Sequence, residues 1–169
     1  IYVDGTLGGA GHSSQIAKRL TTGTLIGIDR DPVALAAAGE RLAPYGDRVK
    51  LVHSNFCEIK QVLKDLNIEG VDGILLDLGV SSPQLDDGSR GFSYMADAPL
   101  DMRMNNEDPL TAAVVVNSWS QEELKRILYD YGEERYASRI ASAICSRREV
   151  KPIETTLELV DIIRGAMPA

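Results

Sequence analysis

The sequence predicts an α/β fold built on a doubly wound, parallel, Rossmann-like sheet. Short apolar strands alternate with helical segments through the first 80 residues, which is typical of a parallel sheet covered by helices. The stretches Thr24–Asp29 and Val71–Leu78 are apolar and end at or near an acid, as a strand buried on both faces should. No strand is expected after residue 80, so a helical unit follows an incomplete sheet of about four parallel strands.

Local patterns predict each element of the first half. Asp31 and Pro32 are expected as the N-cap and first residue of a helix that runs to about Leu42. The other expected helices cover Ser14–Leu20 and Phe56–Leu66, and the expected strands cover Tyr2–Asp4, Thr24–Asp29, Val49–His53 and Val71–Leu78. Right-handed crossovers predict the spatial strand order 3-2-1-4.

The second half begins with a long loop. Residues 79–109 are rich in proline, glycine and polar residues, and a loop of this length in a compact domain is usually functional. Helices are expected at 111–118, from the capping box at Ser120 to about Tyr131, at 133–148 and at 156–166. We therefore place the sheet and its loop at residues 1–105 and a helical domain at 106–169. We expect the chain to be cut short at both ends, with further strands past Ala169.

Composition narrows the class of protein. The 169 residues are 44% hydrophobic, enough for one domain with a small insertion, and no apolar run is long enough to cross a bilayer. The net charge of −7 argues against a simple basic nucleic-acid binder, although a local basic face is compatible with it. Cys57 and Cys145 match no metal or redox spacing, so we expect no metal site and thiols in a reducing, cytoplasmic compartment.

The stretch from Tyr2 to Ser14 is a strand–loop–helix unit with four glycines. Glycine permits positive-φ backbone and leaves room for a ligand to touch the main chain. Ser13 or Ser14 is expected to cap the helix, whose free N–H groups suit an electron-rich ligand. The spacing fits neither G-x-G-x-x-G nor the P-loop, and a glycine-rich turn that binds nothing is the alternative.

Three acids are expected close to this turn. Asp29 ends the second strand, about 20 residues past the turn, where an acid binds the ribose diol in nucleoside-binding sheets. A helix-capping or surface acid is the alternative. Asp77, near the end of the fourth strand, faces the same crevice if the sheet is parallel, or is an ordinary strand-end acid. Asp4 ends the first strand and could instead hold the glycine loop by hydrogen bonds.

Other candidates lie beside the same strand ends. Ser81 and Gln84 follow the fourth strand and could position a polar substrate, although serine and proline also form ordinary turns. Phe56 could stack on a flat base or belong to the core, and His12 could lie near the ligand.

Cations of the second half could contact phosphates. Arg135 and Arg139 are four residues apart, which predicts one shared helix face. With Arg90, Arg103, Arg147, Arg148 and Lys151 they could bind phosphate groups. The alternative is a solvated face whose arginines pair with neighbouring glutamates.

Several stretches together resemble one enzyme family, and the match covers essentially the whole chain. The most specific run extends from Asp72 to Arg103. The stretches are residues 4–13 (DGTLGGAGHS), 28–32 (IDRDP), 72–86 (DGILLDLGVSSPQLD), 90–93 (RGFS), 99–104 (PLDMRM) and 131–135 (YGEER). They resemble the MraW/RsmH family of S-adenosylmethionine-dependent methyltransferases, which act on N4 of a cytidine in small-subunit ribosomal RNA.

The resemblance implies a class I methyltransferase sheet with a helical domain inserted after the fourth strand, and S-adenosyl-L-methionine as cofactor. The cofactor-binding residues that it implies are Gly8, Ala10, Gly11 and His12 around the methionine end, Asp29 at the ribose, Phe56 and Asp77 beside the adenosine, and Gln84 closing the site. The substrate-binding residues that we expect are Arg90, Asp101, Arg103, Arg139 and Arg148. Thr6 and Ala10 replace two glycines of the usual methyltransferase loop, and Ser81-Ser82-Pro83 stands where an Asp/Asn-Pro-Pro-aromatic motif is usual.

Methyl transfer to N4 requires that the amine approach the methyl group in line and at near-attack distance. A group that accepts an N4 proton would make the nitrogen more nucleophilic, and Asp77 and Ser81 are the catalytic candidates. The base would have to leave its stack to reach the pocket. Two other functions stay open: a catalytically silent module that binds ribosomal RNA or the ribosomal subunit, and an NAD-type oxidoreductase, although the latter's G-x-G-x-x-G turn is absent.

Overall fold

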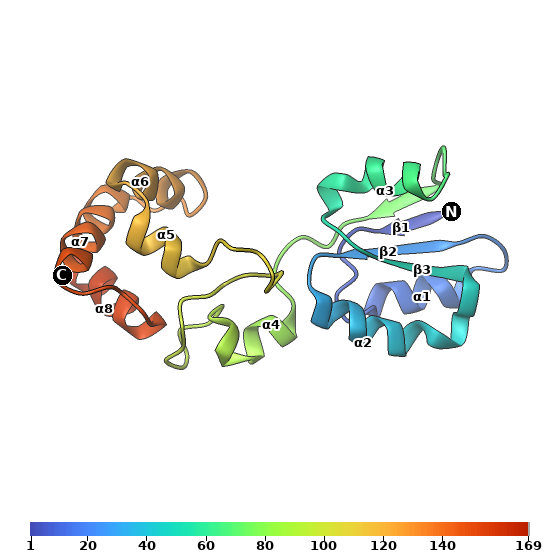
Figure 1. The fold of residues 1–169 in the computed structure, drawn as a ribbon, viewed down its shortest axis with the longest axis horizontal. Coiled ribbons are helices and arrows are strands. Elements are labelled where there is room, and N and C mark those ends of the chain that lie inside the picture. Colours follow the sequence, from blue (N-terminus) through green and yellow to red (C-terminus); the bar gives the residue numbers. More distant parts are fainter. Residues whose placement is uncertain (169) are drawn as a thin grey trace. The chain divides into compact units, whose positions relative to one another are not determined.

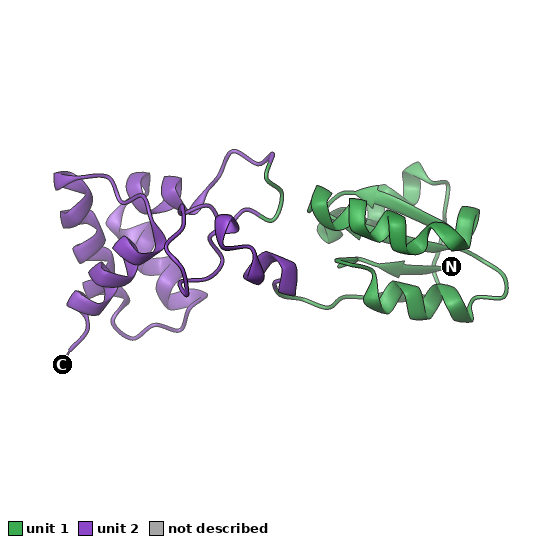
Figure 2. Cartoon of the chain, turned by 90° about the horizontal axis from the view of Figure 1, so that it is seen from below, with its two compact units in different colours: residues 1–79, 104–106 green, residues 80–103, 107–169 purple. Residues whose placement is uncertain are grey.

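The protein forms two compact units, which the computed structural model describes over residues 1–168 (Figure 2). The sheet unit comprises residues 1–79 together with 104–106, and the helical unit comprises residues 80–103 and those from 107 onward. The segment 80–103 thus groups with the helices, whereas the sequence suggested a boundary between residues 105 and 106. Its Leu100 is buried in the core of the helical unit, which accounts for this grouping.

The sheet unit contains four parallel strands in the order β3-β2-β1-β4 (Figure 1). Its elements are β1 (Tyr2–Asp4), α1 (Gly11–Arg19), β2 (Leu25–Asp29), α2 (Pro32–Leu42), β3 (Val49–His53), α3 (Ile59–Asp65) and β4 (Gly73–Leu75), with 3-10 turns at Ala43–Arg48 and Phe56–Glu58. Val3 of β1 pairs with Ile26 on one side and with Ile74 on the other. The predicted strand order and the parallel sheet are confirmed.

Apolar side chains cover both faces of the sheet at β1 and β2, whereas Ile74 of β4 is 52% exposed, so the expectation that the fourth strand is buried was wrong. Figure 1 shows α1 and α2 on one face and α3 on the other. The first face is packed by the cluster Leu7, Ala10, Ala17, Leu25, Ala38 and Leu42, and the second by Val3, Ile26, Ile28 and Val62. Because β2 lies inside the sheet and between these layers, its continuous apolar sequence is explained.

The start of α1 differs from the prediction. The helix begins at Gly11 rather than Ser14, because Ala10 adopts the left-handed conformation (φ 60°) and is its N-cap. No side chain caps this helix, so the expectation of a Ser13 or Ser14 cap was wrong. The hydroxyl of Ser13 instead donates a hydrogen bond to Asp4.

The strand β4 is also shorter than predicted. It covers Gly73–Leu75 rather than Val71–Leu78, because it pairs with β1, which is equally short. Asp77 therefore lies beyond the strand. Its N–H donates to the hydroxyl of Thr6 instead of to a neighbouring strand.

The helical unit is organised around its longest helix. Its elements are α4 (Ser82–Asp86), a 3-10 turn (Gly88–Arg90), α5 (Ala112–Ser118), α6 (Gln121–Asp130), α7 (Ala137–Val150) and α8 (Thr156–Ala166). Ile140, Ala141 and Ile144 of α7 are buried in a cluster with residues of the other helices. Up to residue 168 no strand follows β4, and only an isolated antiparallel bridge joins Pro99 to Thr155. The predicted all-helical second half is confirmed.

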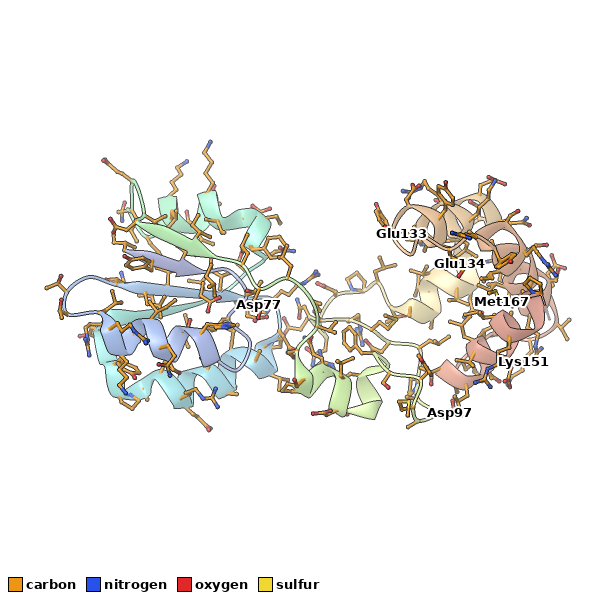
Figure 3. The ribbon with its side chains drawn as sticks, turned by 180° about the vertical axis from the view of Figure 1, so that it is seen from behind. Asp77, Asp97, Glu133, Glu134, Lys151 and Met167 are labelled. Atoms are coloured by element: carbon orange, nitrogen blue, oxygen red, sulfur yellow. The ribbon has the colours of Figure 1, made fainter. Side chains whose placement is uncertain are left out.

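The helix starts in this unit follow their capping residues. Ser120 and Glu123 form the predicted capping box of α6, and Thr155 with Glu158 forms another at α8. The helix α7 begins at Ala137, later than the predicted 133, since Glu133 is in the left-handed conformation (φ 50°). Figure 3 labels Glu133 at the turn before α7.

Backbone and side-chain hydrogen bonds attach the segment 80–103 to residues at the start of α8. The N–H of Leu100 donates to the carbonyl of Glu154 at 3.0 Å. Asp97, labelled in Figure 3, accepts the N–H of Leu157 at 3.2 Å. Gly91 lies at φ 69°, and a Cβ there would overlap the carbonyl oxygen of Pro99. Only glycine fits this position, which lets the segment fold back on itself.

Candidate functional site

The glycine loop between β1 and α1 lies where the strands end. Gly8 and Ala10 both have positive φ, and the N–H of Ala10 donates to the carbonyl of Leu7 at 2.8 Å. The left-handed conformation costs a residue with a Cβ about 1–2 kcal/mol, so the surrounding packing must hold fully buried Ala10 there. A Cβ added to Gly11 would meet nothing within 4 Å, so the loop faces open space at that point.

Asp4 stabilises this loop by hydrogen bonds. Its Oδ1 accepts the N–H of Thr6 at 3.1 Å, and its Oδ2 accepts the hydroxyl of Ser13 at 2.7 Å. Asp4 and Ser13 are both buried. The interpretation of Asp4 as a loop-holding residue is confirmed.

Asp29 links the end of β2 to the same loop. Its Oδ2 accepts the N–H of Gly8 at 2.7 Å, and its Oδ1 accepts the N–H of Asp31 at 2.9 Å. These bonds fix the orientation of a partly exposed carboxylate. Each carboxylate oxygen has a second lone pair, so both retain acceptor capacity for hydroxyl groups. Asp31 itself caps α2 as predicted, accepting the N–H of Val33.

Asp77 and His12 face each other across the glycine loop. His12 Nδ1 lies 3.8 Å from Asp77 Oδ2, and their side chains are 65% and 70% exposed. The Thr6 hydroxyl, which accepts the Asp77 N–H at 2.7 Å, ties the segment after β4 to the loop after β1. Figure 3 labels Asp77 at the carboxyl end of the sheet. This contact of Thr6 could not be predicted from the sequence, because a hydroxyl in a loop carries no spacing signal.

Phe56 lies beside the end of β1. It begins the 3-10 turn after β3, which Asn55 caps by accepting the N–H of Cys57 at 3.1 Å. A Cβ on Gly5 would lie 3.1 Å from the Phe56 Cβ and 2.6 Å from Cδ2 of Leu76. Because Gly5 has no Cβ, the side chains of Phe56 and Leu76 can pack against the loop. Phe56 is 40% exposed, so part of its ring is available to a flat ligand.

The predicted residues Ser81 and Gln84 form the cap of α4. The Ser81 N–H donates to Gln84 Oε1 at 3.0 Å, and the Ser81 hydroxyl accepts the Gln84 N–H at 3.4 Å. Gln84 is 6% exposed. The capping box accounts for Ser and Gln at this spacing, and both residues belong to the helical unit. Their roles in catalysis and cofactor binding stay predictions.

Three of the predicted substrate-binding residues bind one another within the helical unit. Arg103 forms a forked pair with Asp101, through Nε to Oδ1 at 2.9 Å and Nη2 to Oδ2 at 2.7 Å. This hydrogen bonding from Arg103 lowers the pKa of Asp101, and the same partner raises the pKa of Arg103. Nη2 of Arg90 donates to the carbonyl of Arg103 at 2.9 Å. These contacts stabilise the segment 80–103.

The two arginines of α7 differ in their surroundings. Nη1 of Arg148 donates to the carbonyl of Val116 at 2.9 Å and so joins α7 to α5. Arg139 is exposed and lines a groove. Arg135 precedes α7, so the prediction that it shares a helix face with Arg139 was wrong.

The predicted cofactor residues thus fall into two groups. Those at the carboxyl end of the sheet unit are Gly8, Ala10, Gly11, His12, Asp29, Phe56 and Asp77, whereas Gln84 belongs to the helical unit. Within residues 1–168, no three His, Cys, Asp or Glu side chains are grouped as a metal site would require. In the same range, no helix is both long and apolar enough to cross a membrane.

Comparison with known proteins matches the chain to one family. The model described as the MraW methylase family matches residues 1–169. The chain is 59% identical over 170 residues to Ribosomal RNA small subunit methyltransferase H of Brevibacillus brevis, which covers 100% of this chain and 54% of that relative. It is 58% identical to the protein of the same name from Exiguobacterium sibiricum over 169 residues, covering 100% of the chain and 54% of the relative. The corresponding protein of Geotalea uraniireducens is 56% identical over 169 residues, 99% of the chain and 54% of the relative. The chain therefore spans about half the length of these curated relatives.

Proposed function

Because the chain belongs to the MraW methylase family, we propose that the full-length protein transfers a methyl group from S-adenosylmethionine to N4 of a cytidine in small-subunit ribosomal RNA. The proposal is supported most by one observation. The carboxylate of Asp29 at the end of β2, the carboxylate of Asp77 in the segment after β4 and the imidazole of His12 lie around one glycine loop at the carboxyl end of a parallel sheet. Ligands of such sheets bind at this end.

The donor and acceptor groups of the sheet unit fit the parts of S-adenosylmethionine. Asp29 offers acceptors for the ribose diol, and the half-exposed ring of Phe56 offers an apolar surface for the adenine. The start of α1 has no acid in its first turn and no side-chain cap, so its N–H groups suit the carboxylate of the methionine end. The exposed Asp77 carboxylate suits the positively charged groups of the same ligand.

One residue of the chain is proposed to act on the acceptor base, and a second is proposed to hold the first in position. When bound, S-adenosylmethionine supplies an electrophilic methyl group on its sulfonium. Asp77 is the proposed proton acceptor: a carboxylate that pulls on an N4 proton increases the electron density at that nitrogen. The Thr6 hydroxyl holds the Asp77 backbone in place, and so limits how far this carboxylate can move.

Residues of the helical unit have proposed roles as well. Ser81 is proposed as a second polar group near the reacting amine and Gln84 as the residue that closes the cofactor site. Arg90, Asp101, Arg103 and Arg148 are proposed to shape and hold the RNA-facing surface, since their mutual and backbone contacts make that surface rigid. Ribosomal RNA or the ribosomal subunit is the proposed partner, and the cytoplasm is the proposed compartment.

Calorimetry of the full-length protein tests the cofactor assignment. We expect S-adenosylhomocysteine to bind and NAD not to bind. Binding of NAD with no binding of S-adenosylhomocysteine would support an oxidoreductase instead. Binding of neither, with retained affinity for ribosomal RNA, would support a catalytically silent RNA-binding module.

A further inference from the structure

We propose that a groove in the helical unit binds a phosphate group of the RNA backbone, with Arg139 as its charged ligand. This inference rests on the proposed function and names where the substrate is held. The groove has a volume of about 470 Å³ and is lined by Gln121, Ser138, Arg139, Ser142, Ala143 and Ala166. This volume lies within the range of about 300–1,000 Å³ that is typical of ligand sites.

The lining of the groove consists of hydrogen-bond donors and small residues. The guanidinium of Arg139, the amide of Gln121 and the hydroxyls of two serines can all donate to phosphate oxygens. Among residues 1–168, no carboxylate lines the groove. The two alanines keep it open without adding charge. The hydroxyls and the amide can also accept hydrogen bonds, whereas the Arg139 guanidinium only donates and carries a positive charge. This charge favours a phosphate over a neutral base edge.

The nearest acids in sequence are occupied elsewhere. Glu123 accepts hydrogen bonds from the N–H and hydroxyl of Ser120 at 2.8 and 2.7 Å, which lowers its pKa and keeps it at the cap of α6. Glu122 pairs with Lys125 at 3.5 Å. Lys125 therefore offsets the charge of Glu122, while Glu123 keeps its charge but is held at the cap of α6.

Arg139 differs from three other arginines that the sequence suggested for RNA contact. Arg90 and Arg148 each donate to a backbone carbonyl, and Arg103 donates to the carboxylate of Asp101. Within the described part of the chain, the Arg139 side chain makes no such bond. A guanidinium without an internal partner can bind a phosphate without first breaking a contact.

The groove includes two residues of the first turn of α7, Ser138 and Arg139. The Glu134 carboxylate accepts the N–H of Tyr136 at 2.7 Å and so offsets part of the positive helix dipole at this end. The attraction for an anion therefore comes mainly from the guanidinium of Arg139. Because the net charge of the whole chain is −7, such contacts must be local to be effective.

The test compares variants of the full-length protein in binding to protein-free, in vitro transcribed small-subunit ribosomal RNA at several salt concentrations. We expect R139A to weaken RNA binding about two- to fivefold, as for an exposed charge pair. It should also reduce the slope of log K against log salt by about 0.7–0.9, the change expected for one phosphate contact. R139K should restore most of the slope, because it keeps the charge.

The matched control is Arg147→Ala, which removes an exposed arginine of the same helix outside the groove. It should leave the salt slope unchanged. Circular dichroism and unchanged affinity for S-adenosylhomocysteine would establish that R139A is folded. A wild-type slope in folded R139A, or an equal loss in R147A, would overturn the inference. So would a loss seen with the assembled ribosomal subunit but not with protein-free RNA, because the partner would then be a ribosomal protein.

The inference and the proposed function fail in different ways. If R139A keeps the wild-type slope while the wild-type protein methylates RNA, only the groove assignment is wrong. If the wild-type protein binds RNA with an Arg139-dependent slope but transfers no methyl group, the proposed function is wrong and the phosphate site stands.

Discussion

Replacing Asp29 by alanine removes the acceptor that we assign to the ribose and also two internal hydrogen bonds. Its carboxylate holds the N–H of Gly8 at 2.7 Å and that of Asp31 at 2.9 Å. A lost hydrogen bond to a charged group costs about 1.5–3 kcal/mol, which corresponds to a loss of affinity for S-adenosylhomocysteine of roughly 10- to 160-fold. Part of this loss would come from a loosened glycine loop rather than from the ribose itself.

A ligand without ribose hydroxyls separates the contact between Asp29 and the ribose from the effect of Asp29 on the glycine loop. Calorimetry of the full-length protein would compare S-adenosylhomocysteine with an analogue that lacks both ribose hydroxyls. The wild-type protein should prefer the ribose form, whereas Asp29→Ala should bind both ligands almost equally, because the difference reports the Asp29–diol contact alone. Asp47→Ala, which removes an exposed acid before β3 at the opposite end of the sheet, is the control and should keep the preference. A folded Asp29→Ala variant that still prefers the ribose form by the wild-type factor would refute the reasoning.

Three further changes test other parts of the structure. Thr6→Val should lower turnover more than cofactor affinity, because the Thr6 hydroxyl accepts the Asp77 N–H at 2.7 Å. Thr6→Ser keeps the hydroxyl and should restore turnover. Wild-type turnover in Thr6→Val would contradict this role. Gly91→Ala should destabilise the protein by at least about 1–2 kcal/mol in denaturant unfolding, because alanine at φ 69° is strained and its Cβ overlaps a backbone carbonyl; unchanged stability would show that the loop can adapt. The hydrogen bond from Lys151 lowers the pKa of Glu158 from 4.5 to about 2, so its stabilising effect is present above pH 4.5 and is lost as the pH falls towards 2. In thermal unfolding, the difference between wild type and Glu158→Gln should therefore shrink over that range, and a constant difference would disprove the coupling.

The sheet could be predicted from sequence because each of its strands and helices carries a local signal. The strand β2 is apolar throughout and lies between two layers, and Asp31 with Pro32 marks the start of α2. The strand order follows from crossover handedness, which is the same for almost all such connections. The predicted length of β4 was wrong because pairing with the short strand β1 decides it, and pairing is not visible in the apolar run itself.

The role of Asp4 in holding the glycine loop was predicted, but the other loop contacts could not be, because they depend on backbone conformation. Ala10 takes a left-handed conformation that sequence reasoning reserves for glycine, and this shifts the start of α1 by three residues. Asp4 buries its carboxylate against Ser13, which removes that serine from the helix cap. The site acids were predicted from their positions at strand ends, whereas the Thr6–Asp77 hydrogen bond joins residues 71 apart and emerges only from the folded sheet.

Nucleoside analysis of the methylated RNA tests the central claim most directly. The full-length protein would be incubated with unmethylated small-subunit ribosomal RNA and methyl-labelled S-adenosylmethionine, and the digested RNA examined by mass spectrometry. The account predicts labelled N4-methylcytidine with the wild-type protein and a rate about 10²–10⁴-fold lower with Asp77→Asn, the range for loss of a general base. Label in another nucleoside, or the wild-type rate with Asp77→Asn, would contradict it.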